Sequence, residues 1–349
     1  MKAIVLTGPG EPFVMEDRPD PKAGPGEAVA RVLACGSGLT IQHTRIGRGI
    51  PANYPVVIGH EITGEIVETG SGVTGLKTGD PVTCYFYLDC GQCKWCLSNR
   101  PTLCSNLGGH VGRQIDGGYA EYIKLPERNF IKIPDSLDWK RQPAEVSVLC
   151  DALATPFKVI RRARIAPMDT VAVIGAGGGL GIHMVMMARW AHARVIAVDV
   201  AAGKLEKCRE VGAHETVDAS GGGMTEALRD LTGGEGVDVV VDFVSSAQTL
   251  TDGVKALGLG GRLATLGGSG STAPFEAMGR DFTAKEIEVM GSRYCTRQEV
   301  IDTLNLAARG DVWPLVTEKY GFNTEDAELV HERLEKGEVL GRAALMVAG

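Results

Sequence analysis

Four cysteines in the first third of the chain are spaced so that they could bind one metal ion. They follow the pattern C-x2-C-x2-C-x7-C and are Cys90, Cys93, Cys96 and Cys104. Zn²⁺ prefers four thiolates in a tetrahedral arrangement, and cysteines this close in sequence can supply them without long-range ordering of the chain. A disulfide cluster or buried free thiols are the alternatives, but nothing else in the sequence is typical of a secreted protein. The spacing therefore predicts a closed, structural zinc site.

Three side chains that precede this cluster could also bind zinc. Cys35 offers a thiol, and the run Gly59-His60-Glu61 offers an imidazole and a carboxylate. A single Cys or His is usually a core or surface residue, so a second metal site depends on what brings these residues together.

A glycine-rich segment at 175–181 has the composition of a dinucleotide-binding loop. Its candidate cofactor contacts are Gly175, Gly178, Gly179, Leu180 and Gly181. Glycines there permit a tight turn, let backbone N–H groups approach a pyrophosphate, and let a helix pack closely on a strand. The spacing is G-x-x-G-x-x-G, which departs from the standard G-x-G-x-x-G. A structural turn is the alternative, but the loop falls between an expected strand and an expected helix, which favours cofactor binding.

Asp199, which ends the next expected strand, is the residue that would select the cofactor. A carboxylate at this position accepts hydrogen bonds from ribose hydroxyls and repels a 2′-phosphate. Val200 and Ala201 follow, so no Arg is present directly after it to neutralise a phosphate. NAD is therefore favoured over NADP.

The elements that would position these residues change in character near residue 150. Before it, short β-rich segments alternate with Gly and Pro turns, which is typical of a partly open barrel or sheet. From Asp151 to Met290, strands and helices alternate, which predicts a doubly wound parallel sheet. Strands are expected at 170–174, 194–199, 237–242 and 261–266, with helices at 181–189 and 202–211. Helices at 299–308 and 324–336 and a strand at 342–347 complete the chain.

Composition narrows the function classes. A chain of 349 residues with 44% hydrophobic content predicts about two globular domains. A net charge of −7 argues against a nucleic-acid partner. No apolar run approaches the roughly 18 residues that span a bilayer, and no signal peptide is recognised. Nine cysteines without such a signal suit a reducing compartment, so a cytoplasmic protein without a membrane partner is expected.

Together these motifs resemble the zinc-dependent medium-chain alcohol dehydrogenase family along essentially the whole chain. The cysteine cluster, the G-H-E-x-x-G string from Gly59, the run Cys35-Gly36-Ser37 and the glycine loop occur in the order expected for that family. The runs 117–122, 291–292 and 341–342 also match. The resemblance implies an α/β protein with a GroES-like β-rich catalytic domain and a Rossmann domain. The expected boundaries are 1–152 plus 292–349 for the first and 153–291 for the second.

The resemblance also assigns roles to residues. Cys35 and His60 would hold a catalytic zinc, with Glu61 as a ligand or as an alternate fourth ligand. Family spacing to Thr155 gives Asp151 as the third ligand, with Cys150 next to it as the open alternative. Ser37 and Thr40 would carry the substrate proton. Lys204 would contact the ribose, with an exposed helix charge as the alternative, and Arg342 would contact the cofactor.

Two positions depart from the family pattern C-G-[ST]-D-x-H. Gly38 stands where the family often has Asp, which removes an expected partner for the zinc ligands. Thr40 stands where the family has the terminal His of the proton relay. His43 is nearby, but an ordinary surface histidine is the favoured interpretation there.

These expectations define an alcohol dehydrogenase with two zinc ions per chain and NAD. It would reversibly oxidise a secondary or cyclic alcohol to a ketone or aldehyde. The alternatives are a zinc-independent enoyl or quinone reductase of the same superfamily, and a non-enzymatic NAD(H)-binding zinc protein. Metal content separates them, because each alternative needs only one zinc. A homodimer or homotetramer is expected.

The substrate is the least defined of these expectations. The segment 151–157 resembles that of 6-hydroxycyclohex-1-ene-1-carbonyl-CoA dehydrogenases, whose substrate is a cyclic secondary alcohol. Candidate pocket residues are Tyr85, Tyr87, Leu107 and His110. A coenzyme A thioester would need a basic entrance, for which the candidates are Arg45, Arg48 and Arg113, although ordinary surface arginines are the favoured interpretation.

Overall fold

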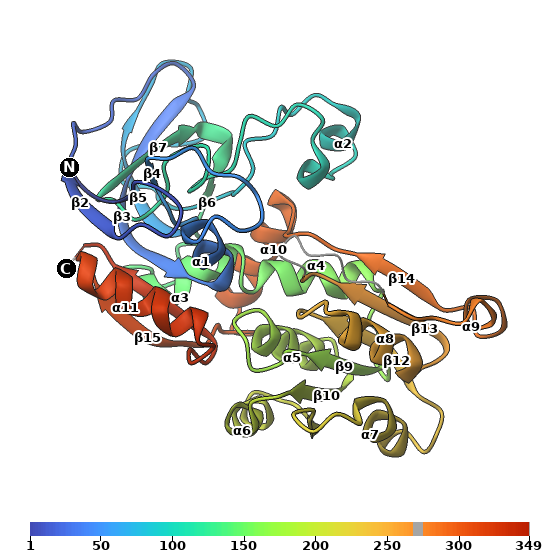
Figure 1. Ribbon diagram of the computed structural model, residues 1–349. Helices are drawn as coiled ribbons and strands as arrows, with labels where there is room; N and C mark the ends of the chain where they lie inside the picture. The colour runs from blue at the N-terminus through green and yellow to red at the C-terminus, as the bar shows by residue number, and fades with distance from the viewer. Residues whose placement is uncertain (268–274, 349) are drawn as a thin grey trace. The chain divides into compact units, whose positions relative to one another are not determined.

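The computed structural model describes residues 1–267 and 275–348, which form two compact units (Figure 1). The first unit comprises residues 1–154 and 295–349, and the second comprises residues 155–294. The ranges expected from the sequence were 1–152 plus 292–349 and 153–291. None of the helices in the described parts of the chain has both the length and the apolar character that a bilayer crossing requires.

The first unit is built on a seven-stranded sheet and a three-stranded sheet. The larger sheet has the strand order β15-β16-β3-β5-β6-β8, with β7 also paired to β3. Its strands are β3 (Glu27–Ser37), β5 (Glu61–Thr69), β6 (Pro81–Cys84), β7 (Tyr122–Pro126), β8 (Phe130–Lys132), β15 (Val316–Gly321) and β16 (Arg342–Met346). The smaller sheet has the order β2-β1-β4. Its strands are β1 (Lys2–Leu6), β2 (Phe13–Asp17) and β4 (Val56–Val57).

Strand β3 is the centre of the larger sheet and sets the positions of the candidate metal ligands. Most of its residues are buried, and both of its edges are paired: β5 pairs with one edge, and β7 and β16 pair with successive parts of the other. The antiparallel register places Cys35 opposite Ile62 and Gly36 opposite Glu61. Strand β16 starts at Arg342, and Ala343 pairs with Ser37. Residues far apart in sequence therefore meet at one end of β3.

The helices of the first unit are short, apart from two. They are α1 (Leu39–Arg45), α2 (Lys94–Leu97), α3 (Pro143–Ser147), α10 (Arg297–Ala308) and α11 (Thr324–Glu335), with 3₁₀ turns η1 (Pro101–Leu103), η2 (Glu127–Asn129) and η3 (Val148–Cys150). Helix α10 starts two residues before the expected position because Thr296 and Glu299 form a reciprocal capping box. Helix α11 starts where expected, after Asn323 accepts the backbone N–H of Asp326.

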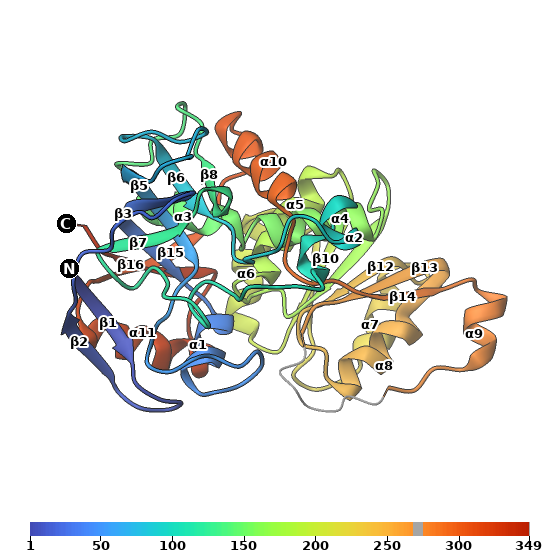
Figure 2. The same ribbon diagram turned by 90° about the horizontal axis from the view of Figure 1, so that it is seen from above.

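The second unit is a parallel six-stranded sheet with helices (Figure 2). Its strands are β9 (Thr170–Ile174), β10 (Arg194–Asp199), β11 (Glu215–Asp218), β12 (Val237–Asp242), β13 (Leu257–Thr265) and β14 (Glu288–Gly291). Its helices are α4 (Ala154–Arg162), α5 (Gly181–Trp190), α6 (Ala202–Glu210), α7 (Met224–Leu231), α8 (Ala247–Ala256) and α9 (Gly279–Ala284). The order β11-β10-β9-β12-β13-β14 is that of a dinucleotide-binding Rossmann sheet, with the reversal of strand order between β9 and β12.

Candidate functional site

The four clustered cysteines surround one point on a lobe of the first unit. Their Sγ atoms lie within 4.8 Å of one another, and the closest pairs, Cys93 with Cys96 and Cys90 with Cys104, are 3.5 Å apart. A disulfide requires about 2.05 Å between the sulfurs. Four sulfurs at about 2.3 Å from a tetrahedral zinc are about 3.8 Å apart. The arrangement therefore fits zinc and contains no disulfide.

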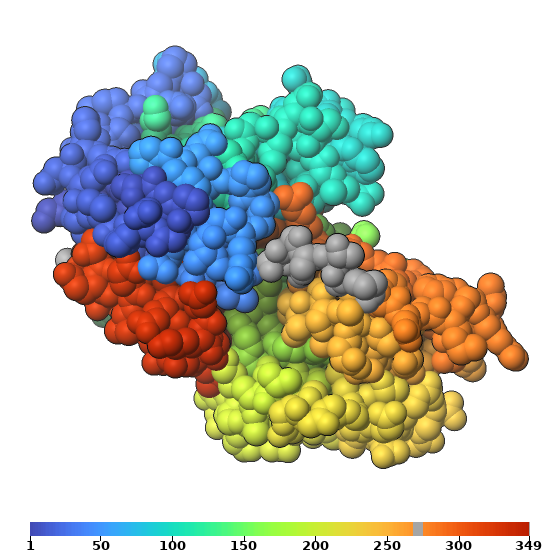
Figure 3. All heavy atoms as spheres, viewed as in Figure 1, coloured from blue at the N-terminus to red at the C-terminus, as the bar shows by residue number. Residues whose placement is uncertain are grey.

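The chain around the lobe prepares these thiols for a metal. Cys93 is the N-cap residue of helix α2, and backbone N–H groups of Ser105 and Cys96 lower the pKa of the Cys93 thiol to about 6. The thiolate form, which binds metal, is favoured as a result. The buried carboxylate of Asp89 pairs with Arg297 of α10 and accepts the N–H of Gly91, so it ties the lobe to its unit. Atoms of this segment lie at the surface in Figure 3.

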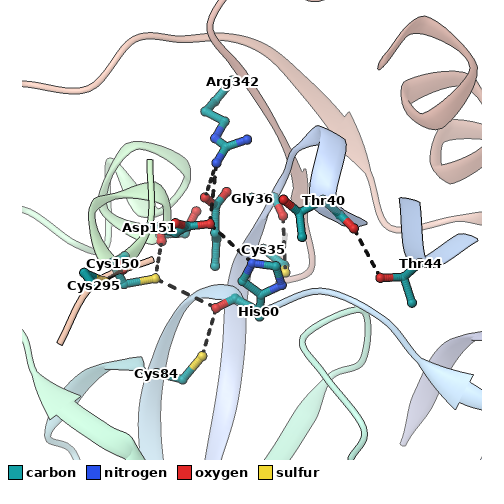
Figure 4. Close-up of polar contacts among 12 residues, drawn as sticks. Cys35, Gly36, Thr40, Thr44, His60, Cys84, Cys150, Asp151, Cys295 and Arg342 are labelled. Atoms are coloured by element: carbon teal, nitrogen blue, oxygen red, sulfur yellow. Dashed lines mark hydrogen bonds and ion pairs between the residues drawn. The ribbon is translucent and has the colours of Figure 1, made fainter. Parts of the chain in front are cut away.

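The expected ligands of the second zinc lie close together in the first unit. Figure 4 shows Asp151 between His60 and Arg342, with Cys35 beside the imidazole. Asp151 Oδ2 is 3.4 Å from His60 Nε2, which is long for a hydrogen bond. The same separation, about 3.3 Å, is expected for a nitrogen and an oxygen that share a tetrahedral zinc. Cys35 comes from β3 and is fully buried.

Burial makes this site suitable for a metal and unsuitable for bare charges. It raises the pKa of the Cys35 thiol and lowers the pKa of the His60 imidazole. The neutral imidazole can bind zinc directly. The buried thiol can lose its proton and bind zinc because the positive charge of the metal compensates the negative charge of the thiolate. The aromatic ring of Phe86 lies 4.4 Å from that of His60, centroid to centroid, and limits its rotation.

The candidate ligands of the second site are spaced more widely than the cysteines of the lobe. Among the residues that the structure describes, the cysteine lobe is the one group whose ligand atoms all lie within 4.8 Å of one another. Cys35, His60 and Asp151 are gathered but do not form so tight a cluster. Glu61 Oε2, close to them, is buried and has no hydrogen-bond partner among the described residues. An unsatisfied buried carboxylate oxygen is costly unless a cation binds it, so the donor set fits zinc.

Arg342 occupies a position that the sequence did not predict. Its Nη2 lies 2.7 Å from Glu61 Oε1 and 3.7 Å from Asp151 Oδ2. Burial raises the pKa of Glu61 to about 8, and the guanidinium opposes that rise. Arg342 therefore compensates the carboxylates of the candidate zinc site, whereas its expected contact with the cofactor stays a prediction.

Gly38 explains how Arg342 reaches these carboxylates. A Cβ at position 38 would lie 1.8 Å from Arg342 Nη1, so any side chain there would displace the guanidinium. The absence of a side chain at position 38 therefore leaves room for the guanidinium of Arg342. Arg342 is a partner of the carboxylates of Glu61 and Asp151 that the sequence alone did not indicate.

Gly38→Ala is expected to displace Arg342 and leave Glu61 buried without its partner. Breaking a buried ion pair from one side costs about 3 kcal/mol of unfolding free energy, which denaturant unfolding would measure. The control is Gly203→Ala, because no atom lies within 4 Å of a Cβ there. Adding Glu61→Gln to Gly38→Ala should recover much of the loss. An unchanged loss in the double variant would contradict this explanation.

The two candidates for the third ligand differ in their surroundings. Cys150 Sγ donates to Ser147 O at 3.3 Å and lies 3.8 Å from His60 O, and burial raises the pKa of its thiol. Cys84 Sγ donates to His60 O as well, at 3.0 Å. Cys150 is thus held as a neutral thiol directed at backbone carbonyls, while Asp151 approaches His60 Nε2. This geometry favours Asp151.

Ser37, which was expected in the proton relay, contacts a tyrosine hydroxyl. Ser37 Oγ lies 2.5 Å from the hydroxyl of Tyr119, a contact that was not predicted. The carbonyl oxygen of Thr40 accepts hydrogen bonds from Thr44 Oγ1 and Arg113 Nη2. The role of Thr40 in a relay stays a prediction.

The residues expected around the substrate are mostly buried. Tyr85 and Tyr87 are almost completely buried, and the ring of Tyr87 lies 5.0 Å from that of His110. Arg113 is also buried and donates to backbone carbonyls, while Arg45 pairs with Glu328. Of the three arginines proposed for a basic entrance, these two are therefore engaged within the protein.

In the second unit, the glycine loop joins β9 to α5 at the point where the strand order reverses. Gly175 adopts φ +75°, which favours glycine, and a Cβ at Gly181 would lie 2.0 Å from the carbonyl oxygen of Gly175. Gly178 N donates to Gly175 O at 3.1 Å. The loop thus requires glycine at its first and last positions, and it begins helix α5, where a pyrophosphate would bind.

Asp199 ends β10 beside this loop. Its Oδ2 accepts the N–H of Gly177 at 2.8 Å, and its Oδ1 accepts the N–H of Ala201 at 2.9 Å. A carboxylate has about four acceptor positions, so both oxygens can still accept ribose hydroxyls. Lys204 of α6 packs on the loop, with its Cβ 2.5 Å from the Cβ position of Gly177.

Comparison with known proteins places this arrangement in a family. The alcohol dehydrogenase GroES-like domain matches residues 24–135, and the zinc-binding dehydrogenase family matches residues 179–309. The chain is 32% identical to an NAD-dependent alcohol dehydrogenase of Sulfolobus acidocaldarius, over 99% of this chain and 100% of that protein. It is 30% identical to an acryloyl-coenzyme A reductase of Metallosphaera sedula, over 97% and 99%.

A solved structure gives the same result. The alcohol dehydrogenase from the archaeon Aeropyrum pernix has a TM-score of 0.89 at 32% identity, over 99% of this chain and 100% of that one. The chain belongs to the zinc-dependent medium-chain alcohol dehydrogenase family. The predicted fold class, a GroES-like β-rich domain with a Rossmann domain, is confirmed.

Proposed function

We propose that the chain is an NAD-dependent alcohol dehydrogenase whose catalytic zinc is held by Cys35, His60 and Asp151. The observation that carries this proposal is the approach of Asp151 Oδ2 to 3.4 Å from His60 Nε2, with both side chains and Cys35 buried in the first unit. A protein with structural zinc alone has no need for such a donor set. Two zinc ions per chain are therefore expected, one in the cysteine lobe and one here.

The chain's own residues prepare this site for an alcohol. When bound, zinc polarises a substrate oxygen and lowers the pKa of a bound hydroxyl group. Burial keeps His60 neutral, so its Nε2 can offer a lone pair. Arg342 compensates the charge of Glu61 and Asp151. Ser37, two residues after Cys35, lies on the same face of β3 and is the hydroxyl that would receive the alcohol's hydrogen bond.

The glycine loop and Asp199 support NAD as the hydride acceptor. The relative from Sulfolobus acidocaldarius is named as NAD-dependent, which agrees with the carboxylate at this position. All nine cysteines are free thiols, which supports a reducing, cytoplasmic location.

Asp199→Gly combined with Val200→Arg is expected to change the cofactor preference from NAD toward NADP. The change removes the carboxylate that repels a 2′-phosphate and adds a guanidinium that can bind it, and Val200 is 68% exposed, so an Arg has room. Titration of both cofactors by fluorescence would give the ratio of their Kd values. Asp199→Asn is the control, since it removes the charge but adds no phosphate ligand. An unchanged preference in a folded double variant would contradict the role of Asp199.

The structure gives more support to an uncharged cyclic or secondary alcohol than to a coenzyme A thioester. Arg45 and Arg113 are engaged with Glu328 and with backbone carbonyls, and the aromatic residues near His60 offer apolar surface. Coenzyme A thioesters should be tested as substrates too, because acryloyl-coenzyme A reductases are among the relatives.

The decisive experiment combines metal analysis with a substrate panel. We expect two zinc ions per chain by native mass spectrometry, and NADH formation with secondary and cyclic alcohols but not with hydroxyacyl-coenzyme A esters. One zinc per chain without NADH formation would favour a zinc-independent reductase or a binding protein. Reduction of an enoyl thioester would identify the reductase.

A further inference from the structure

A series of hydrogen bonds leads from Ser37 to the surface of the first unit. Ser37 Oγ lies 2.5 Å from Tyr119 Oη, which lies 3.1 Å from His331 Nε2. His331 Nδ1 lies 2.8 Å from Gln42 Oε1, and Gln42 Nε2 donates to Glu335 Oε2 at 3.0 Å. The first four residues are completely buried, and Glu335 is exposed on α11. The series joins a surface carboxylate to a hydroxyl beside the candidate zinc site.

The carboxylate fixes the direction of every hydrogen bond in the series. A deprotonated carboxylate can only accept, so Gln42 directs its amide N–H to Glu335 and its oxygen to His331. His331 must then carry its proton on Nδ1, which leaves Nε2 as an acceptor. Tyr119 has one hydroxyl proton and donates it to this nitrogen. Ser37 must therefore donate its own proton to Tyr119.

The surroundings hold His331 in this state. Burial, together with the nearby charge of Arg45, lowers the pKa of the imidazole to about 3, so it stays neutral. The ring of Phe13 lies 5.2 Å from that of His331, and the ring of Tyr119 lies 5.9 Å from it. These contacts leave a neutral, immobilised acceptor at the centre of the series.

We propose that Tyr119, His331, Gln42 and Glu335 are positioning residues that hold the Ser37 hydroxyl as a hydrogen-bond acceptor toward the substrate. With its only proton directed to Tyr119, Ser37 can accept the O–H of an alcohol but cannot donate to the carbonyl of a ketone. The site therefore binds the alcohol in preference to the ketone. This inference rests on the proposed function, because it takes Ser37 to face the substrate oxygen.

The first test determines the direction of the hydrogen bonds and requires no measurement of enzyme activity. NMR of the full chain labelled with ¹⁵N-histidine should show His331 protonated on Nδ1. Glu335→Lys replaces the acceptor by a donor, so Gln42 should rotate and His331 should change to the Nε2–H tautomer. Glu332→Lys, with the same charge change on the same helix, should leave the tautomer unchanged. An Nε2–H tautomer in the unmodified protein, or no change in Glu335→Lys, would overturn the proposed direction.

The second test compares the KM values of the alcohol and the ketone. Tyr119→Phe releases the Ser37 proton, so the KM of the ketone should fall relative to that of the alcohol, by about fivefold for one hydrogen bond. Glu335→Lys should shift the same ratio in the same direction. An equal rise of both KM values would show a structural role only and overturn the preference. An unmodified enzyme that oxidises no alcohol would instead overturn the proposed function, and the NMR result would still decide the direction of the hydrogen bonds.

Discussion

Asp151→Asn is expected to remove one of two zinc ions per chain and nearly all turnover. The amide keeps the shape of the side chain but loses the negative charge that a metal needs beside the neutral imidazole of His60. A loss of about a thousandfold in kcat, roughly 4 kcal/mol, is expected once the substrate oxygen is no longer polarised. Zinc content by native mass spectrometry and steady-state kinetics would be measured on the same preparation.

Cys150→Ala is the matched control, because it changes the neighbouring candidate ligand. Its thiol is directed at the carbonyl oxygens of Ser147 and His60, so both zinc ions and most activity should remain. A modest loss of stability, about 1 kcal/mol, is expected from the missing buried sulfur. Loss of zinc in Cys150→Ala, with zinc retained in Asp151→Asn, would make the site a centre of two thiolates and one imidazole.

Cys93→Ser is expected to release the other zinc and to lower the melting temperature by about 10–20 °C. A closed four-thiolate site contributes its binding energy to folding, and a loss of about 5 kcal/mol corresponds to a shift of that size in a chain of this length. Calorimetry and zinc content would be measured together. Turnover per folded molecule should stay within a few-fold, because the lobe has no position open to substrate.

Cys208→Ala provides the comparison for the loss of a thiol outside the lobe. Cys208 is buried in α6, so its substitution should cost stability only through packing, with both zinc ions retained. If Cys93→Ser kept its melting temperature and its zinc but lost turnover, the lobe would have to be the catalytic site.

The sequence was most informative where the interacting residues are neighbours in the chain. The four cysteines of the lobe lie within one short segment, and strands such as β9 and β10 are continuous apolar runs because both of their faces are buried. Strand β13 was expected from residue 261 but begins at Leu257, and its early part contains glycines, which are uncommon inside strands. The capping box of Thr296 and Glu299, which begins α10 early, could have been recognised.

Interactions between distant segments were not predictable from a single sequence. Arg342 reaches Glu61 across 281 positions because β16 pairs with β3, and no local pattern indicates that pairing. The contact between Tyr119 and His331 spans 212 positions and joins a loop to α11. A buried histidine in an amphipathic helix is usually interpreted as a core residue, so His331 carried no signal of its own.

The fit of Arg342 against Gly38 constrains the order in which this site can be changed. Gly38→Asp, which would restore the residue common in the family, places new atoms where the guanidinium already lies. Shortening Arg342 first would empty that space but leave Glu61 uncompensated until an alternative partner arrived. Each of these single changes is therefore unfavourable, because a change at one position alters the space or the charge at the other. Positions 38 and 342 should accordingly behave as one epistatic unit in mutational libraries of this enzyme.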